Sequence, residues 1–179
     1  MINIFNNDTH MVSVIHDFMT QHECDNILQY SLPKMEPSMV VSSDGKGQKH
    51  HARTGSNTWL QHNTNDVILN VATRLSETVR MPLENAEPFQ VVHYGEGQEY
   101  SYHYDSFEKN DAHYNEKYVS PQGGQRLVTA LGYLRDVPKG GETGFNKLGV
   151  NIQPKQGTVV IWYNVCLLYT SPSPRDRVQ

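Results

Sequence analysis

The chain of 179 residues has few cysteines, no long hydrophobic run and no excess of basic charge. Its two cysteines are Cys24, which we expect to be a buried free thiol on the apolar face of a helix, and Cys166. No apolar stretch approaches the roughly 20 residues that a membrane-spanning helix needs. The N-terminus also lacks the basic start and small-residue cleavage site of a secretory signal. These absences predict a cytoplasmic protein without a membrane partner.

The charge balance gives no sign of a nucleic-acid partner. The formal net charge is −4 with 19% charged residues, and no basic stripe is visible along the sequence. With 37% hydrophobic residues, a chain of this length can bury a core without dividing into two domains. We therefore expect one compact catalytic or binding domain.

Hydrophobic periodicity predicts two early helices followed by many short strands. The first helix is expected to open at Thr20, which has the capping-box spacing to Glu23, and to end before Pro33; the second covers 65–80. Residues 36–58 are read as a long loop. The expected strands cover 11–15, 89–94, 99–105, 126–134, 150–152 and 158–163. This order predicts an α+β fold, a double-stranded β-helix (jelly roll) with N-terminal helices packed on one sheet.

His103 and Asp105 are the candidate metal ligands. Two positions apart on an extended strand, their side chains would project from the same face and could bind one metal ion. With a second histidine from elsewhere they would form the three-ligand face that holds ferrous iron and leaves coordination positions open. Taken alone, the pair could equally be a polar strand edge. The polar segment 106–125 that follows is a candidate lid.

Several separate blocks place this pair in a wider pattern. They are RTGSNTWL (53–60), ENAEPFQVVHYGEGQEYSYHYDSF (84–107), GGQRLVTALGYLRDV (123–137), GGETGF (140–145) and QPKQGTVVIWYN (153–164). In this order the blocks resemble the catalytic domain of the prolyl 4-hydroxylases, within the iron(II)- and 2-oxoglutarate-dependent dioxygenases. The resemblance implies 4-hydroxylation of peptidyl proline, coupled to decarboxylation of 2-oxoglutarate. It also implies Fe²⁺, 2-oxoglutarate and O₂ as cofactors, L-ascorbate as reductant, and a proline-containing peptide or protein as substrate.

The resemblance assigns roles to particular residues. It implies that His103 and Asp105 bind iron, and that Tyr94 and Thr143 bind the co-substrate 2-oxoglutarate. Without it, Tyr94 reads as an ordinary strand aromatic and Thr143 as a turn residue. Residues implied to contact the substrate, each of which could also be a surface charge, are Arg53, Glu87 and Arg126. Thr129 and Tyr133 share one strand face and are expected to line the same cavity.

The sequence departs from the family pattern near its end. The family has a second histidine and then a lysine after the block that ends at Asn164, but this sequence has no histidine after His113. Residues 166–179, CLLYTSPSPRDRVQ, look like a translated sequencing adapter and are expected to be a non-native tail. The domain is then 1–165, missing its last strands, and we expect this chain to be an impaired enzyme. Gly55 stands where the family more often has serine, which predicts a looser loop.

Two other functions stay open at this point. The domain could be a hydroxylase of the same class that acts on another side chain, a free amino acid or a small metabolite. It could also be a non-catalytic jelly-roll binding module, because one metal ligand is missing. The sequence leaves the substrate protein and the oligomeric state open.

Overall fold

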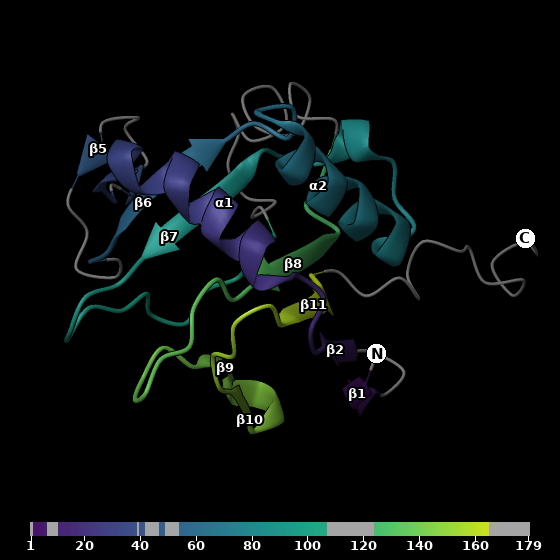
Figure 1. The fold of residues 1–179 in the computed structure, drawn as a ribbon. Coiled ribbons are helices and arrows are strands. Elements are labelled where there is room, and N and C mark those ends of the chain that lie inside the picture. The colour runs from purple at the N-terminus through teal and green to yellow at the C-terminus, as the bar shows by residue number, and fades with distance from the viewer. Residues whose placement is uncertain are drawn as a thin grey trace, which may run out of the picture.

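The structure is a computed structural model that describes residues 2–6, 11–38, 40–41, 47–48, 54–106 and 124–164. Arg53, most of the candidate lid and all of 166–179 lie outside these ranges. Within them, Figure 1 shows the two α-helices together on one side of the molecule and the strands β9 and β10 on the opposite side.

The main sheet is antiparallel and has the strand order β1-β2-β11-β8. Its strands are β1 (Ile2–Asn6), β2 (Met11–Ile15), β8 (Val128–Gly132) and β11 (Val159–Tyr163). β11 lies between β2 and β8, so the strand closest to the C-terminus joins segments from both halves of the chain.

Three smaller groups of strands complete the described β structure. β9 (Thr143–Phe145) pairs with β10 (Val150–Ile152), and the 3₁₀ turn η4 (Asn146–Leu148) lies between them. β6 (Ser56–Leu60) pairs with β3 (Glu36–Pro37) and β7 (Phe89–His93). The last pair is β4 (Val40–Val41) with β5 (Gly47–Gln48).

Both helices begin at a capped residue, and the cap of α1 is the predicted one. α1 (Gln21–Ser31) has Thr20 as its N-cap, and both hydrogen bonds of the predicted capping box to Glu23 are formed. α2 (Asp66–Val79) begins after Asn65, whose side chain accepts a hydrogen bond from the Ile68 N–H at 2.9 Å. Short 3₁₀ turns follow each helix, η1 (Leu32–Lys34) and η2 (Leu83–Asn85). Neither helix in the described part of the chain has the length and apolar character to span a membrane.

Hydrophobic side chains pack on both faces of β11. Val159 and Ile161 face α1, α2 and the β6–β7 pair, in a cluster that includes the fully buried Cys24 thiol. The alternate residues Val160 and Trp162 face β2, β9 and β10. The alternation of a strand therefore gives β11 two buried faces. The prediction that Cys24 is a buried free thiol is confirmed.

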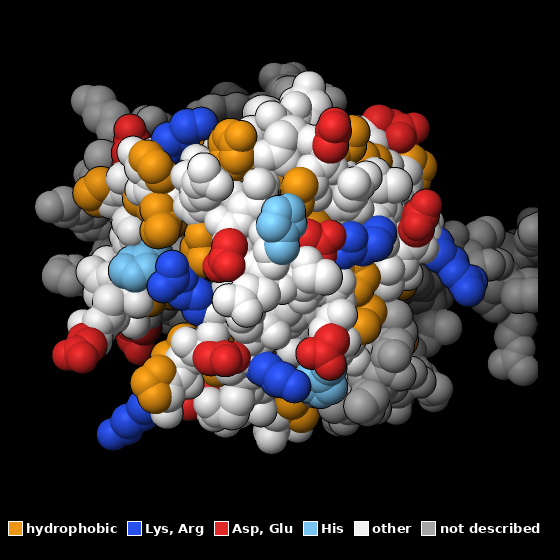
Figure 2. All heavy atoms as spheres, in the orientation of Figure 1, with side chains coloured by type: hydrophobic (Ala, Val, Ile, Leu, Met, Phe, Trp, Pro, Cys, Tyr) orange, Lys and Arg blue, Asp and Glu red, His pale blue; other side chains and the backbone are white. Residues whose placement is uncertain are grey.

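The surface over the helices carries charges of both signs. Figure 2 shows Lys and Arg side chains interspersed with Asp and Glu side chains on this face. Such mixing creates no extended field of one sign on the face seen there.

Three predicted elements differ from the structure. Residues 99–105 form no strand apart from a single bridge at Tyr100, because no neighbouring strand pairs along this segment in the described part of the chain. The strand predicted over 126–134 is confined to Val128–Gly132. The segment 36–58, read as a loop, contributes β3, β4, β5 and part of β6.

Candidate metal centre

The segment before β8 brings His103 and Asp105 together although it is not a strand. Nε2 of His103 lies 3.2 Å from Oδ1 of Asp105. The other ring nitrogen, Nδ1, lies 2.8 Å from the carbonyl oxygen of Ser101, and the ring stacks on Tyr100 with 3.7 Å between ring centroids. A local turn and an aromatic stack therefore fix the imidazole with Nε2 directed at the carboxylate.

The two oxygens of Asp105 have different partners. Oδ1 faces His103, while Oδ2 accepts a hydrogen bond from the Thr129 hydroxyl at 2.7 Å. Burial alone would raise the pKa of the Asp105 carboxyl, but the hydrogen bonds from His103 and Thr129, with the nearby charge of Arg126, outweigh it and lower the pKa. The carboxyl is therefore ionised at neutral pH and can act as a metal ligand.

Thr129 is itself held by the next strand. The side-chain amide of Asn164 donates a hydrogen bond to the Thr129 hydroxyl oxygen at 2.9 Å. Asn164 was not among the residues singled out in the sequence. Asn164 is the last residue of the block 153–164. Its position next to Thr129 can be recognised only when the register of β11 against β8 is known.

Two of the predicted substrate residues form an ion pair beside the candidate metal ligands. Arg126 donates to Glu87 through Nε at 2.5 Å and Nη2 at 2.8 Å, in a two-point geometry. Hydrogen bonding to Glu87 is the main cause of the raised pKa of Arg126. The guanidinium is thus kept charged next to Asp105. The third such residue, Arg53, lies outside the described residues.

The two predicted co-substrate residues lie in different surroundings. Tyr94 is half-buried, and its ring packs against Gly55. The Thr143 hydroxyl lies 2.6 Å from the Tyr133 hydroxyl, which is also 3.1 Å from the Ile152 carbonyl oxygen. Burial raises the pKa of Tyr133, so its hydroxyl stays protonated at neutral pH.

The surroundings of Gly55 differ from the expectation of a looser loop. A Cβ at this position would lie 2.6 Å from both the His93 carbonyl oxygen and a ring carbon of Tyr94, far inside normal contact distance. The glycine is buried and allows close packing. The prediction of a looser loop at Gly55 is therefore wrong.

Exposed tyrosines flank the candidate ligands. Tyr102 and Tyr104 have 71% and 68% of their surface exposed. The Lys147 ammonium group donates a hydrogen bond to the Tyr104 hydroxyl at 2.5 Å and lies 5.1 Å from that ring's centroid. Through these contacts η4 supports the segment that carries His103 and Asp105.

Comparisons with known proteins show which sequences and structures this chain is similar to. Residues 89–171 match the 2OG-Fe(II) oxygenase superfamily. The chain is 34% identical over 173 residues to the probable prolyl 4-hydroxylase 10 of Arabidopsis thaliana, with 86% of this chain and 57% of the relative covered. It is 37% identical over 152 residues to prolyl 4-hydroxylase 5 of the same plant, with 84% and 48% covered.

Residues 89–171 therefore resemble an oxygenase domain of the 2OG-Fe(II) superfamily, and most of the chain resembles prolyl 4-hydroxylases. Its sequence spans about half the length of the curated relatives it matches.

Solved structures resemble this oxygenase domain as well. A viral collagen prolyl hydroxylase from Paramecium Bursaria Chlorella virus-1, solved as a 2OG complex, aligns with a TM-score of 0.62 at 25% identity, covering 85% of this chain and 77% of the other. A Pseudomonas putida prolyl-4-hydroxylase aligns with a TM-score of 0.56 at 15% identity, covering 86% and 79%. The second likeness concerns the fold alone.

Proposed function

We propose that the oxygenase domain hydroxylates peptide-bound proline at C4, using Fe²⁺, 2-oxoglutarate and O₂, with L-ascorbate as reductant. His103 and Asp105 act as two of the iron ligands. The observation that carries this proposal is the approach of His103 Nε2 to Asp105 Oδ1 while the opposite ring nitrogen faces a backbone carbonyl. Bound iron would couple the oxidative decarboxylation of 2-oxoglutarate to hydroxylation of an unactivated C–H bond.

The donor set fits a divalent metal ion. The Ser101 carbonyl can only accept, so Nδ1 of His103 carries a proton and Nε2 is the ring nitrogen available to a metal ion. Without a metal ion, Nε2 donates a hydrogen bond to the Asp105 carboxylate, and a cation bound between the two groups would take the place of that proton. Two ligand atoms each about 2.1 Å from an ion at a right angle are about 3 Å apart, close to the observed separation.

The ligand set is not complete in this sequence. The part of the chain that the structure describes holds no group of three His, Cys, Asp or Glu side chains arranged for a metal. No histidine follows His113 in the sequence. With these two ligands alone the domain would bind iron weakly, and a complete site needs a third ligand that the described residues do not provide.

The surrounding residues suit the two organic substrates. Tyr94 and Thr143 would bind 2-oxoglutarate through their hydroxyls, with Tyr133 holding Thr143 in place. The exposed rings of Tyr102 and Tyr104 suit a proline-rich peptide, because extended polyproline segments bind to aromatic surfaces. Arg53, Glu87 and Arg126 would position that peptide. Two relatives named prolyl 4-hydroxylases and a viral collagen prolyl hydroxylase support this substrate class.

The fold is proposed to be an incomplete jelly roll. The main sheet forms one layer, and the β9–β10 pair packs across the cluster around Val160. His103 and Asp105 then lie at the mouth between the layers, next to β8.

The activity test uses the domain joined to the segment that follows Asn164 in its parent gene. We expect proline-rich peptides to gain one oxygen atom on proline, with one succinate formed for each oxygen added. His103→Ala and Asp105→Ala should each reduce this turnover by at least about 100-fold, because a metal ligand is lost. Peptide mass spectrometry and succinate assay measure both quantities. His22→Ala, in the exposed part of α1, is the matched control and should retain activity.

The same assay separates the alternatives. Oxygen transfer to a free amino acid or another side chain, and none to peptidyl proline, would contradict the proposed substrate. No iron-dependent consumption of 2-oxoglutarate in the completed chain would contradict the enzyme assignment and favour a binding module.

A further inference from the structure

The two oxygens of the Asp105 carboxylate contact different groups. Oδ1 is directed at His103 Nε2 at 3.2 Å, and Oδ2 is bound by the Thr129 hydroxyl at 2.7 Å. The Asp105 side chain is only 23% exposed, so water has limited access to replace either partner. One oxygen is therefore directed at the candidate ion and the other is held by the protein.

The direction of the hydrogen bonds is fixed by chemistry. The Thr129 hydroxyl has a single proton, and it donates this proton to Oδ2 of Asp105. This leaves the Thr129 oxygen as an acceptor, and the Asn164 amide nitrogen, 2.9 Å away, is a matching donor. Asn164 thus favours the one hydroxyl orientation that binds Asp105.

Both residues stand on rigid, paired strands. Thr129 lies in β8 directly opposite Trp162 of β11, and the Asn164 N–H continues this ladder by donating to the Leu127 carbonyl at 2.9 Å. Side chains fixed on paired strands are positioned more accurately than side chains on loops. The irregular segment that carries Asp105 is thereby tied to the main sheet.

We propose that Thr129, oriented by Asn164, is a positioning residue that keeps Asp105 a one-oxygen metal ligand. This inference rests on the proposed iron site. A carboxylate that binds through one oxygen occupies one coordination position and leaves the others free for the co-substrate and oxygen. Without the Thr129 hydroxyl, Oδ2 loses its donor and the carboxylate can rotate.

The first test measures metal affinity of the purified chain with Mn²⁺, whose free ion is counted by electron paramagnetic resonance. Thr129→Val, which keeps the side-chain shape but removes the hydroxyl, should weaken Mn²⁺ binding about tenfold, the usual cost of losing a partner of a metal ligand. Thr129→Ser should restore it. Thr73→Val is the matched control, because Thr73 donates to a backbone carbonyl in exposed α2 and should not alter affinity.

The second test asks whether Asn164 acts through Thr129. Asn164→Ala alone should weaken Mn²⁺ binding, but added to Thr129→Val it should cause little further loss, since the two residues form one chain of hydrogen bonds. In the metal-free chain, NMR should show that Thr129→Val changes the Asn164 side-chain amide signal, whereas Thr73→Val does not.

The outcomes distinguish this inference from the proposed function. If His103→Ala lowers Mn²⁺ affinity but Thr129→Val does not, the iron site stands and the positioning role is overturned. An Asn164 amide signal that is unchanged in Thr129→Val overturns it as well. If the wild-type chain binds no Mn²⁺ while the Asn164 signal responds as expected, the hydrogen-bond chain exists and the proposed iron site is what fails.

Discussion

Gly55 has space for a hydrogen atom and for nothing larger. A methyl group there would meet a backbone oxygen of His93 and the ring of Tyr94 at 2.6 Å. We predict that Gly55→Ala lowers the free energy of unfolding by about 1–3 kcal/mol, the usual cost of overpacking. Urea denaturation measures this change.

The control is Gly95→Ala on the other side of Tyr94. A Cβ at Gly95 would come no closer than 3.4 Å to the flexible side chain of Gln98. Its stability should stay within about 0.5 kcal/mol of wild type. Equal losses in both variants would show that the close approach at Gly55 is not the cause.

The sequence predicted the roles of some single residues better than those of others. The pair His103 and Asp105 was found from spacing, yet the side chains meet through a turn and not through the alternation of a strand. Asn164 was missed because its role depends on a neighbour across the sheet, Thr129, and the sequence does not contain that register.

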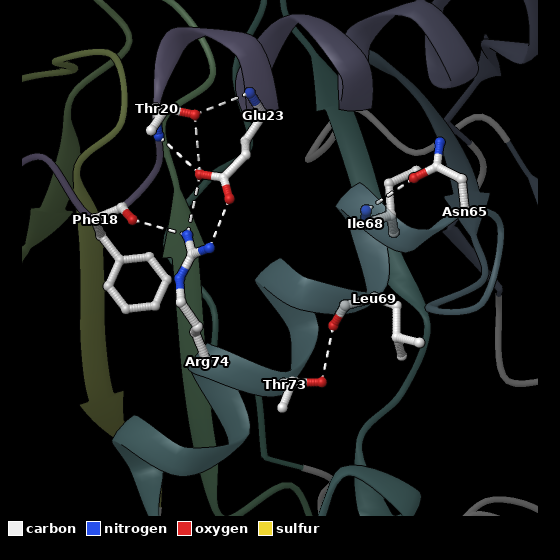
Figure 3. A network of polar contacts seen from close by, with 8 residues as sticks. All are labelled: Phe18, Thr20, Glu23, Asn65, Ile68, Leu69, Thr73 and Arg74. Atoms are coloured by element: carbon white, nitrogen blue, oxygen red, sulfur yellow. Dashed lines mark hydrogen bonds and ion pairs between the residues drawn. The ribbon is translucent and has the colours of Figure 1, made fainter.

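At the scale of elements, an ion pair links the start of α1 to α2. Figure 3 shows Glu23 accepting hydrogen bonds from Thr20 at the cap and from Arg74 of α2, while Arg74 also donates to the Phe18 carbonyl. Hydrogen bonding to Arg74 is the main reason that the pKa of Glu23 is lowered. The Glu23 side chain is 13% exposed and the Arg74 side chain 39%, so solvent screens this pair in part.

We predict that Glu23→Gln lowers the free energy of unfolding by about 1–2 kcal/mol at neutral pH. A carboxyl whose pKa is lowered by folding stabilises the protein above its unfolded pKa of about 4.3, and this stabilisation is lost as the pH falls through the folded value. Urea denaturation of wild type and variant at several pH values measures the difference.

The exposed Glu77 of α2 provides the control for this pair. Glu77→Gln should change stability by less than about 0.5 kcal/mol at every pH tested. The interpretation of Glu23 is wrong if the gap between wild type and Glu23→Gln stays constant down to strongly acidic pH.

Helices were more predictable than strands for a local reason. α1 and α2 carry their own caps, Thr20 with Glu23 and Asn65, within a few residues of where each begins. The segment 99–105 has strand-forming residues, but no neighbouring strand pairs along it in the described structure. A strand depends on partners distant in sequence, and composition alone does not identify them.

For the whole molecule, β11 is the strand on which both hydrophobic clusters depend. Val160 is fully buried in the cluster opposite the helices. We predict that Val160→Ala lowers the free energy of unfolding by about 2–3 kcal/mol through lost contacts and a small cavity. Thermal and urea denaturation check this value, and Val92→Ala, at an exposed valine of β7, should have a much smaller effect.

The overall class of the protein could be predicted because composition, helix order and strand signals agree. The strand order could not be predicted, because the hydrophobic patterns of β2, β8 and β11 do not indicate which strands are neighbours. The family resemblance suggested candidate site residues but did not indicate which strands pair.

The position of β11 between β2 and β8 has a consequence for synthesis on the ribosome. β2 is made early, yet its inner neighbour does not exist until residues 159–163 have been translated and have left the exit tunnel. The nascent chain must therefore carry an unpaired, apolar β2 edge for most of its production. Ribosome-bound chains that stop before Val159 should accordingly need chaperones to stay unaggregated.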